Sequence, residues 1–240
     1  MTKAAVLVDG GFYRKRAYHY WGDKKPTERA DELMKYVFRH LDKKDGPCTR
    51  ELYRIFYYDC PPMERTVFHP LHGNIEFRKL PGYTWALDFF DELKKRRKVA
   101  LRMGRLSDTG AYYELTPDAT KRVVAGRTKV SELDDADFRV AFKQKGVDMR
   151  MGVDISSLAY EGIVDQVILI AGDSDFVPAA KAARRKGIDF ILDPMGNQIG
   201  DDLFEHIDGM ESFIREGDPS KSKRKRGTMA TQKALPIQNR

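Results

Sequence analysis

Short apolar runs recur along the chain, and each is followed closely by an acidic residue. The runs lie at residues 4–8, 51–58, 167–171 and 187–193. Runs of this length that are rich in β-branched residues are typical of strands buried on both faces of a parallel sheet. The acids that end them or follow them are Asp9, Asp59, Asp173, Asp175 and Asp193. The pattern therefore predicts buried strands with carboxylates at their carboxyl ends.

Helical periodicity occupies the stretches between these runs. Leu33, Val37 and Leu41 recur at helical spacing, which predicts an amphipathic helix over 30–43. Further helices are predicted at 12–21, 85–99, 178–186 and 201–213, and a small hairpin from 111–115 and 121–125. Alternation of strands and helices predicts an α/β protein with a three-layer, Rossmann-like architecture: a central, mainly parallel sheet with helices on both faces.

Length and charge suggest how the chain is divided. The 240 residues, 41% of them hydrophobic, suffice for one large α/β domain, predicted at 1–216 with an elaboration at about 61–135. The remainder, 217–240, is rich in Ser, Lys, Arg and Gln. Residues 219–240 hold seven Lys and Arg and no acid, so this segment accounts for the net charge of +7. Such composition predicts a disordered basic tail.

Other sequence features narrow the class of protein. There is no apolar run of about 18 residues, which argues against a membrane span, and the N-terminus lacks a signal-peptide pattern. Cys48 and Cys60 are the only cysteines and have no metal-binding spacing, so a cytoplasmic location is expected. Basic runs at 94–105 and at 181–186 suit a phosphate backbone, although a solvated helix face explains either run alone.

The acids at the strand ends suggest metal chemistry. The carboxyl ends of parallel strands share one edge of the sheet, so these carboxylates are expected to meet there. Several carboxylates crowded together favour a bound cation, and ligands that are all oxygen favour Mg²⁺ or Mn²⁺ over Zn²⁺. Asp148 and Asp154 are alternatives for one further ligand, since six residues do not bring both to the same face of a helix. Helix capping is the structural alternative for each acid.

Four segments resemble the NYN domain, LabA-like branch, of the PIN-like nucleases. They are VLVDGG at 6–11, YYD at 57–59, KGVDMRMGVDISSLA at 145–159 and ILIAGDSDFVPAAKAARRKG at 168–187. The resemblance implies a PIN-like fold and a Mg²⁺- or Mn²⁺-dependent ribonuclease. Many members have Asn three residues after the first Asp, where this chain has Phe12.

The resemblance also implies particular site residues. The metal-binding and catalytic acids would be Asp9, Asp154, Asp173 and Asp175. Residues expected near the metal or the substrate are Ser174, Asp59, Asp193 and Lys145. The expected partner is RNA, most readily a single-stranded region, and a homodimer is compatible with the sequence. One alternative function is a non-catalytic RNA-binding module of the same fold. Another is a small-molecule phosphohydrolase, against which the absence of DxDx[TV] after the first strand argues.

Overall fold

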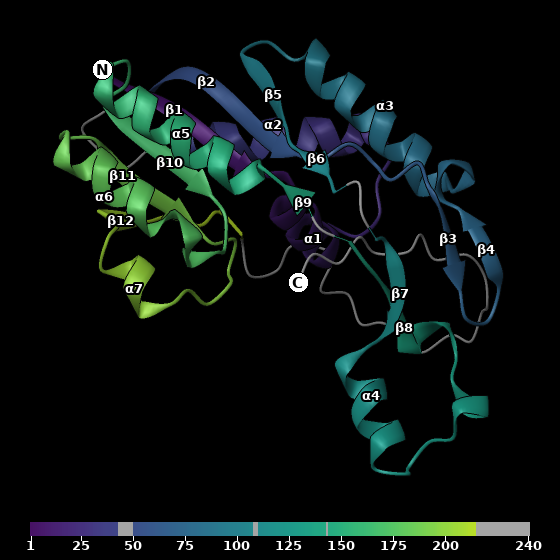
Figure 1. The fold of residues 1–240 in the computed structure, drawn as a ribbon. Helices are drawn as coiled ribbons and strands as arrows, with labels where there is room; N and C mark the ends of the chain where they lie inside the picture. The colour runs from purple at the N-terminus through teal and green to yellow at the C-terminus, as the bar shows by residue number, and fades with distance from the viewer. Residues whose placement is uncertain (43–49, 108–109, 143, 215–240) are drawn as a thin grey trace.

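A single parallel sheet organises the chain. The structure is a computed structural model that describes residues 1–42, 50–107, 110–142 and 144–214. Six of the described strands pair in the order β12-β11-β10-β1-β2-β5, and every neighbouring pair is parallel (Figure 1). They are β1 (Thr2–Asp9), β2 (Arg50–Asp59), β5 (Val99–Met103), β10 (Gln166–Ile170), β11 (Asp189–Asp193) and β12 (Gly209–Met210). The prediction of an α/β fold with a parallel sheet is confirmed.

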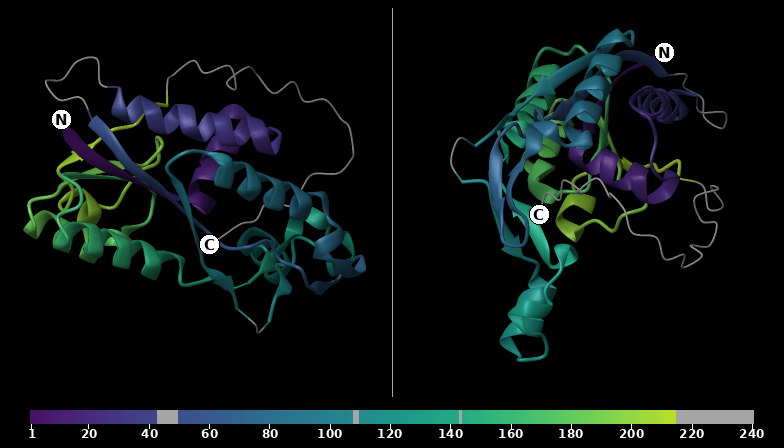
Figure 2. Two further views of the ribbon diagram at one scale, coloured as in Figure 1. Left: turned by 90° about the horizontal axis from the view of Figure 1, so that it is seen from above. Right: turned by 90° about the vertical axis from the view of Figure 1, so that its right-hand side faces the viewer.

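Helices cover both faces of this sheet (Figures 1 and 2). On one face lie α1 (Gly10–Trp21), α2 (Pro26–Leu41) and α3 (Pro81–Lys95). On the other lie α5 (Val147–Tyr160), α6 (Val177–Arg185) and the short α7 (Asp201–Phe204). The architecture therefore has three layers, as the sequence predicts.

Alternation along the central strand divides the core in two. Val6 and Val8 of β1 pack among the residues of α1, α2 and α3, whereas Ala5 and Leu7 pack among those of α5 and α6. Successive side chains of a strand point to opposite faces, so an uninterrupted apolar run is what burial on both faces requires. The same alternation decides toward which helical layer each strand-end acid points.

Residues 61–135 contain both core and peripheral elements. Helix α3 and strand β5 belong to the core layers, so only part of this stretch is peripheral. The peripheral elements extend past this stretch to Lys145. They are β3 (Thr66–His69), β4 (Gly73–Glu76), η1 (Phe77–Lys79), β6 (Arg105–Leu106), β7 (Tyr112–Leu115), α4 (Pro117–Val124), η2 (Val130–Glu132), η3 (Asp135–Asp137), β8 (Phe138–Ala141) and β9 (Gln144–Lys145). Strands β3 and β4, β6 and β9, and β7 and β8 form two-stranded antiparallel pairs. Figure 1 shows α4 projecting beyond the layers.

Two predicted elements are wrong. The hairpin from 111–115 and 121–125 does not form, because β7 pairs with β8 and the intervening segment is α4. Thr116 begins that helix by accepting the backbone N–H of Ala119 at 3.2 Å. The helix predicted over 201–213 ends at Phe204, because the chain then returns to the sheet edge. There Asp208 N–H donates to the carbonyl of Phe190 at 2.8 Å, and β12 pairs with β11.

Two further predictions concern the C-terminal segment and membrane-spanning helices. The predicted basic tail, residues 217–240, lies outside the described residues. Among the helices that the structure describes, none combines the length and the apolar character needed to cross a bilayer.

Candidate active site

Three neighbouring strands bring acids to the carboxyl edge of the sheet. Asp9 is the last residue of β1 and Asp59 the last of β2, and β1 pairs with both β2 and β10. Asp173 follows the end of β10 by three residues. These acids are far apart in sequence and share one edge because the strands are parallel. That edge is where open α/β sheets bind ligands.

Asp9 lies in the centre of this edge. Its Oδ1 accepts the backbone N–H of Phe12 at 3.0 Å and so caps α1, as the structural alternative predicts. Burial raises the pKa of Asp9 to about 6, and the negative charges of Asp59 and Asp148 contribute to this increase, while the hydrogen bond from Phe12 opposes it. A carboxylate in these surroundings is stabilised by any cation that reaches it.

Asp59 already has a cationic partner. Arg14 on α1 forms a two-pronged ion pair with this carboxylate, and the Asp59 side chain is only 1% exposed. Gly10 makes room for the pair, because a Cβ at that position would lie 2.5 Å from Oδ2 of Asp59. Asp59 points toward α1 because it alternates with Tyr58 along β2. The structure thus places Asp59 at the edge with its charge compensated.

Asp148 and Asp154, which the sequence left as alternatives, lie in different surroundings. Helix α5 begins at the carboxyl edge, where Gly146 provides the left-handed backbone, and Asp148 in its first turn raises the pKa of Asp9. Asp154 lies about 9 Å further along the helix axis. Its Oδ2 accepts the Tyr58 hydroxyl at 2.7 Å and Nε of Arg102 at 2.9 Å. Of the two, Asp148 is the acid whose negative charge acts on Asp9.

Asp173 and Asp175 lie where β10 leads into α6. The backbone N–H of Asp175 donates to Oδ1 of Asp173 at 3.2 Å, so Asp173 caps the turn η4 (Ser174–Phe176). The side chain of Ser174 lies outside the described part of the structure. The ring of Phe12 packs against Gly172, where an added Cβ would lie 2.4 Å from Cε2 of the ring. The Phe12 ring therefore lies beside the residue that precedes Asp173.

A surface groove runs from this edge between α5 and α6. It has a volume of about 680 Å³ and is lined by Asp148, Asp175, Met149, Val153, Tyr160 and Pro178, among others. Met149, Val153 and Tyr160 are all more than half exposed. The groove thus has Asp148 and Asp175 at one end, apolar side chains along its length, and Glu161 next to Tyr160 at the other end of α5.

Asp193 and Lys145, also predicted to lie near the site, have surroundings that differ from those of Asp9. Asp193 is fully buried and accepts the Tyr36 hydroxyl at 2.5 Å and the Met195 N–H at 2.7 Å, and it pairs with His40 at 2.8 Å. It alternates toward the layer of α2, so its contacts stabilise the packing of α2 on β11. Lys145 is exposed on β9, just before α5.

The donor atoms at the edge are all oxygens, which suits a hard divalent cation. They are not gathered as a ready-made set, however. Among the described residues, the only group of three His, Cys, Asp or Glu whose ligand atoms all lie within 4.8 Å of one another is His69, His72 and Asp135, outside the sheet. A cation shared by the edge acids would have to draw their side chains together.

Much of the basic run at 94–105 is engaged in local pairs. Lys94 pairs with Asp91, Lys95 with Glu92, Arg96 with Asp31 and Glu92, and Arg102 with Asp154. The run at 181–186 differs, because Lys181, Arg184 and Arg185 line a second hollow of about 770 Å³ together with His206. Of these, Arg184 pairs with Asp208 at 2.8 Å. The better candidate for a phosphate contact is therefore the α6 cluster.

The chain was compared with curated proteins, with solved structures and with protein families. No curated protein matches the chain. A crystal structure of a protein of unknown function, VPA0982 from Vibrio parahaemolyticus RIMD 2210633, is similar over 90% of this chain and 94% of that one, with 12% identity and a TM-score of 0.44. Residues 89–199 match the NYN domain family, a stretch that holds Asp148, Asp154, Asp173 and Asp175 and stops short of Asp9. Residues 89–199 are thus similar to NYN domains, which belong to the PIN-like superfamily.

Proposed function

We propose that this protein is a metal-dependent endoribonuclease whose reaction takes place at the carboxyl edge of the sheet. The observation that supports it most is the convergence of Asp9, Asp148 and the Asp173 turn at that edge, in a chain whose residues 89–199 are similar to NYN domains. NYN domains are generally nucleases that act on RNA. The LabA-like branch stays a prediction.

In this proposal Asp9, Asp148 and Asp173 hold the cation, with Asp175 beside them. Mg²⁺ or Mn²⁺ is the expected ion, because only carboxylate oxygens are offered. When bound, such an ion activates a water and stabilises charge on a phosphoryl oxygen. We propose Asp148 in place of the predicted Asp154, because Asp154 accepts hydrogen bonds from Tyr58 and Arg102, and we place Asp59 outside the ligand set because Arg14 compensates its charge.

The groove between α5 and α6 gives the substrate a path. Its apolar side chains suit the faces of unpaired bases, and Tyr160 adds an exposed aromatic ring, over which Nζ of Lys186 lies 4.3 Å from the centroid. Lys181 and Arg185, further along α6, suit the phosphates of the same strand. A single-stranded segment of RNA is therefore the substrate that these surfaces fit.

Cleavage of single-stranded RNA by the purified full chain tests the proposal. We expect cleavage with Mg²⁺ or Mn²⁺ and none with EDTA. Asp9→Asn, Asp148→Asn and Asp173→Asn should each lower the rate by about 100-fold or more, because each removes a charge that holds the ion. Asp201→Asn, an exposed acid on α7, is the matched control and should retain the parent rate.

Asp154→Asn separates the two alternative ligands. If Asp148 is the ligand, this substitution leaves more activity than Asp148→Asn does. The opposite ranking would restore Asp154 as the metal-binding acid.

A non-catalytic RNA-binding module is the second candidate. It is favoured by the capping roles of Asp9 and Asp173 and by the spread of the edge acids in the described structure. RNA binding that is unchanged by EDTA, with the parent and Asp9→Asn equally inactive on every RNA, would establish this reading over the nuclease.

A further inference from the structure

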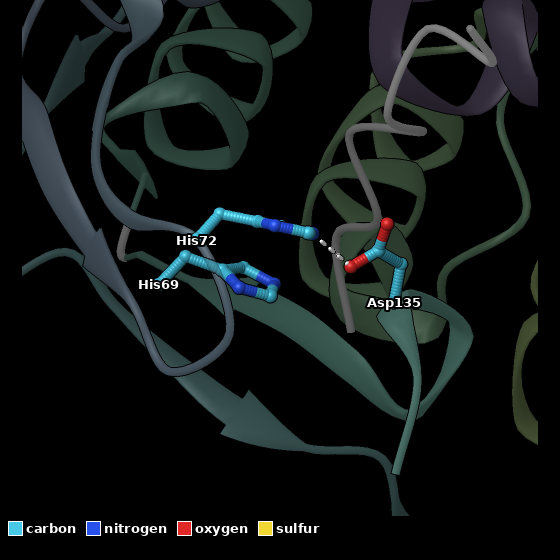
Figure 3. A group of neighbouring side chains, drawn as sticks. All are labelled: His69, His72 and Asp135. Carbon is cyan, nitrogen blue, oxygen red and sulfur yellow. Dashed lines mark hydrogen bonds and ion pairs between the residues drawn. The ribbon is translucent and has the colours of Figure 1, made fainter. Parts of the chain in front are cut away.

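Two histidines and an aspartate meet outside the central sheet. His69 ends β3, His72 lies in the turn before β4, and Asp135 begins η3, 63 residues after His72 in the sequence. One ligand atom from each lies within 4.8 Å of the other two. Figure 3 shows both imidazole rings extending from one turn toward the carboxylate on the facing segment.

The side chains of this group contact one another directly. Nε2 of His72 lies 2.5 Å from Oδ1 of Asp135. The two imidazoles stack with ring centroids 4.8 Å apart and an angle of 23° between their planes. Stacked rings hold their nitrogen atoms on one side of the turn. Two nitrogens and one oxygen therefore lie within 4.8 Å of one another.

Aromatic neighbours fix the deeper histidine. His69 is only 3% exposed, and its ring packs edge-on against Tyr113 at 4.3 Å and against Phe138 at 5.2 Å. Its Nδ1 accepts the backbone N–H of Leu71 at 3.1 Å. A neutral imidazole has one unprotonated nitrogen, which here accepts from Leu71, so metal binding by His69 replaces this hydrogen bond.

Tyr113 adds a polar group to the same place. Its hydroxyl is buried and has no hydrogen-bond partner within the described residues. The Tyr113 ring contacts the ring of His69 edge-on. An ion held by three side chains keeps a fourth position for a solvent molecule, and the hydroxyl is a suitable partner for such a ligand.

The surrounding unit has little apolar core of its own. Among the described residues of β3, β4, β7, α4 and β8, only Val67 and Ala119 are buried hydrophobic residues, and neither belongs to the two core clusters. Small units of this kind are commonly held together by a disulfide or a metal ion. A link between the β3–β4 turn and η3 would join segments that the central core does not reach.

We propose that His69, His72 and Asp135 form a structural binding site for a zinc-class divalent cation, separate from the acidic edge of the sheet. Two imidazole nitrogens and one carboxylate suit Zn²⁺, with Co²⁺ as a spectroscopic substitute, and they do not suit Mg²⁺. Coordination replaces the hydrogen bond between His72 and Asp135 by bonds from both groups to one ion. The ion fastens the peripheral hairpins to each other.

Metal titration of the full chain, produced without a polyhistidine tag and stripped with chelator, tests this site. We expect the chain to take up Zn²⁺ in calorimetry, and Co²⁺ to give the visible absorption of a tetrahedral site. His72→Ala and Asp135→Asn alter exposed side chains, so the protein should stay folded. Each should weaken Zn²⁺ binding at least tenfold and abolish the rise in Tm that Zn²⁺ causes in the parent.

His19→Ala removes an exposed histidine on α1 and is the matched control, which should bind Zn²⁺ as the parent does. Equal Zn²⁺ affinity in His72→Ala and the parent, or no Zn²⁺ uptake by the parent, overturns the proposal. The result is independent of the proposed nuclease, because binding and Tm are measured without RNA, and because Asp9→Asn should leave the Co²⁺ spectrum unchanged.

Discussion

Asp9 carries a charge in a place where water is scarce and two other acids lie nearby. Its pKa of about 6 means that the folded protein holds this proton up to about pH 6, whereas the unfolded chain loses it near the ordinary value of 3.8. The folded state therefore binds more protons between these values, and the stability contributed by Asp9 falls as the pH rises through them. Above about pH 6 Asp9 is ionised in the folded protein, and its burial destabilises the fold by the full amount.

Asp9→Asn should accordingly stabilise the metal-free protein at pH 7.5. A shift of roughly two pKa units corresponds to about 3 kcal/mol, so we expect a gain of about 1 to 3 kcal/mol in the free energy of unfolding. The amide oxygen can still accept the Phe12 N–H, so the cap of α1 survives. Urea unfolding with EDTA at pH 7.5 and at pH 4 measures the gain, which should vanish at the lower pH. A variant no more stable than its parent at pH 7.5 contradicts the assignment of a costly buried charge.

Gly172 tests how closely the edge is packed. In Gly172→Ala the new methyl would meet the Phe12 ring, and we expect a loss of about 1 to 3 kcal/mol from this overpacking. Gly152→Ala is the matched control, because nothing lies within 4 Å of its added methyl and alanine favours the helix by about 0.5 to 1 kcal/mol. Urea unfolding compares the two. Phe12→Leu should recover part of the loss at position 172, and a loss that persists in full would place the strain elsewhere.

At this scale, sequence patterns identify strand-end acids more readily than helix-borne ones. Asp9 and Asp59 each follow a buried run, so their place at the edge follows from the parallel sheet alone. Asp148 and Asp154 belong to one helix, and which of them reaches the edge depends on where α5 begins, a position set by the left-handed Gly146. His69 and Asp135 meet only through tertiary contacts, which a spacing of more than 60 residues does not reveal.

Among the elements, α1 is attached to the sheet by an ion pair as well as by apolar packing. Arg14 and Asp59 join this helix to β2 beneath the acidic edge. Removing one partner leaves the other charge buried, which costs about 3 to 5 kcal/mol in proteins. Removing one partner should therefore lower the free energy of unfolding more than removing both.

Arg14→Met should lower the free energy of unfolding by about 3 to 5 kcal/mol at pH 7.5. The loss should shrink at pH 5, because burial already raises the pKa of Asp59 and the loss of Arg14 raises it further, so the carboxyl is protonated more readily. The double variant Arg14→Met with Asp59→Asn should recover most of the stability at pH 7.5. Urea unfolding of all three chains measures these differences, and a double variant as unstable as Arg14→Met would show that the arginine acts by packing.

Elements with strong periodicity are predictable here, and those that depend on distant partners are not. The helix at 30–43 appears as α2, and the run at 51–58 appears within β2. The segment at 111–115 is a strand as predicted, but its partner β8 is more than 20 residues away, beyond α4. The short β12 forms by pairing with the edge of β11, a contact that the local pattern does not reveal. That pattern therefore predicts a longer helix in place of α7 and β12.

For the whole molecule, the uneven charge predicts how RNA is held. Deleting residues 219–240 removes seven Lys and Arg and no acid. We expect weaker RNA binding and a smaller dependence of log Kd on log salt concentration, by up to about five in slope for a single strand. Fluorescence anisotropy at several salt concentrations measures both. Metal binding at the acidic edge should be unaffected, and an unchanged salt slope would mean that the segment does not contact RNA.

The central position of β1 has a consequence for synthesis on the ribosome. One of its two neighbours, β10, is separated from it by about 160 residues, as the hydrogen bond from Lys3 N–H to Asp165 illustrates. At about 5 to 20 residues per second, translation needs roughly 10 to 30 seconds to supply that neighbour. Throughout that interval the nascent chain carries an apolar strand with a bare edge, which is the form of polypeptide that chaperones bind.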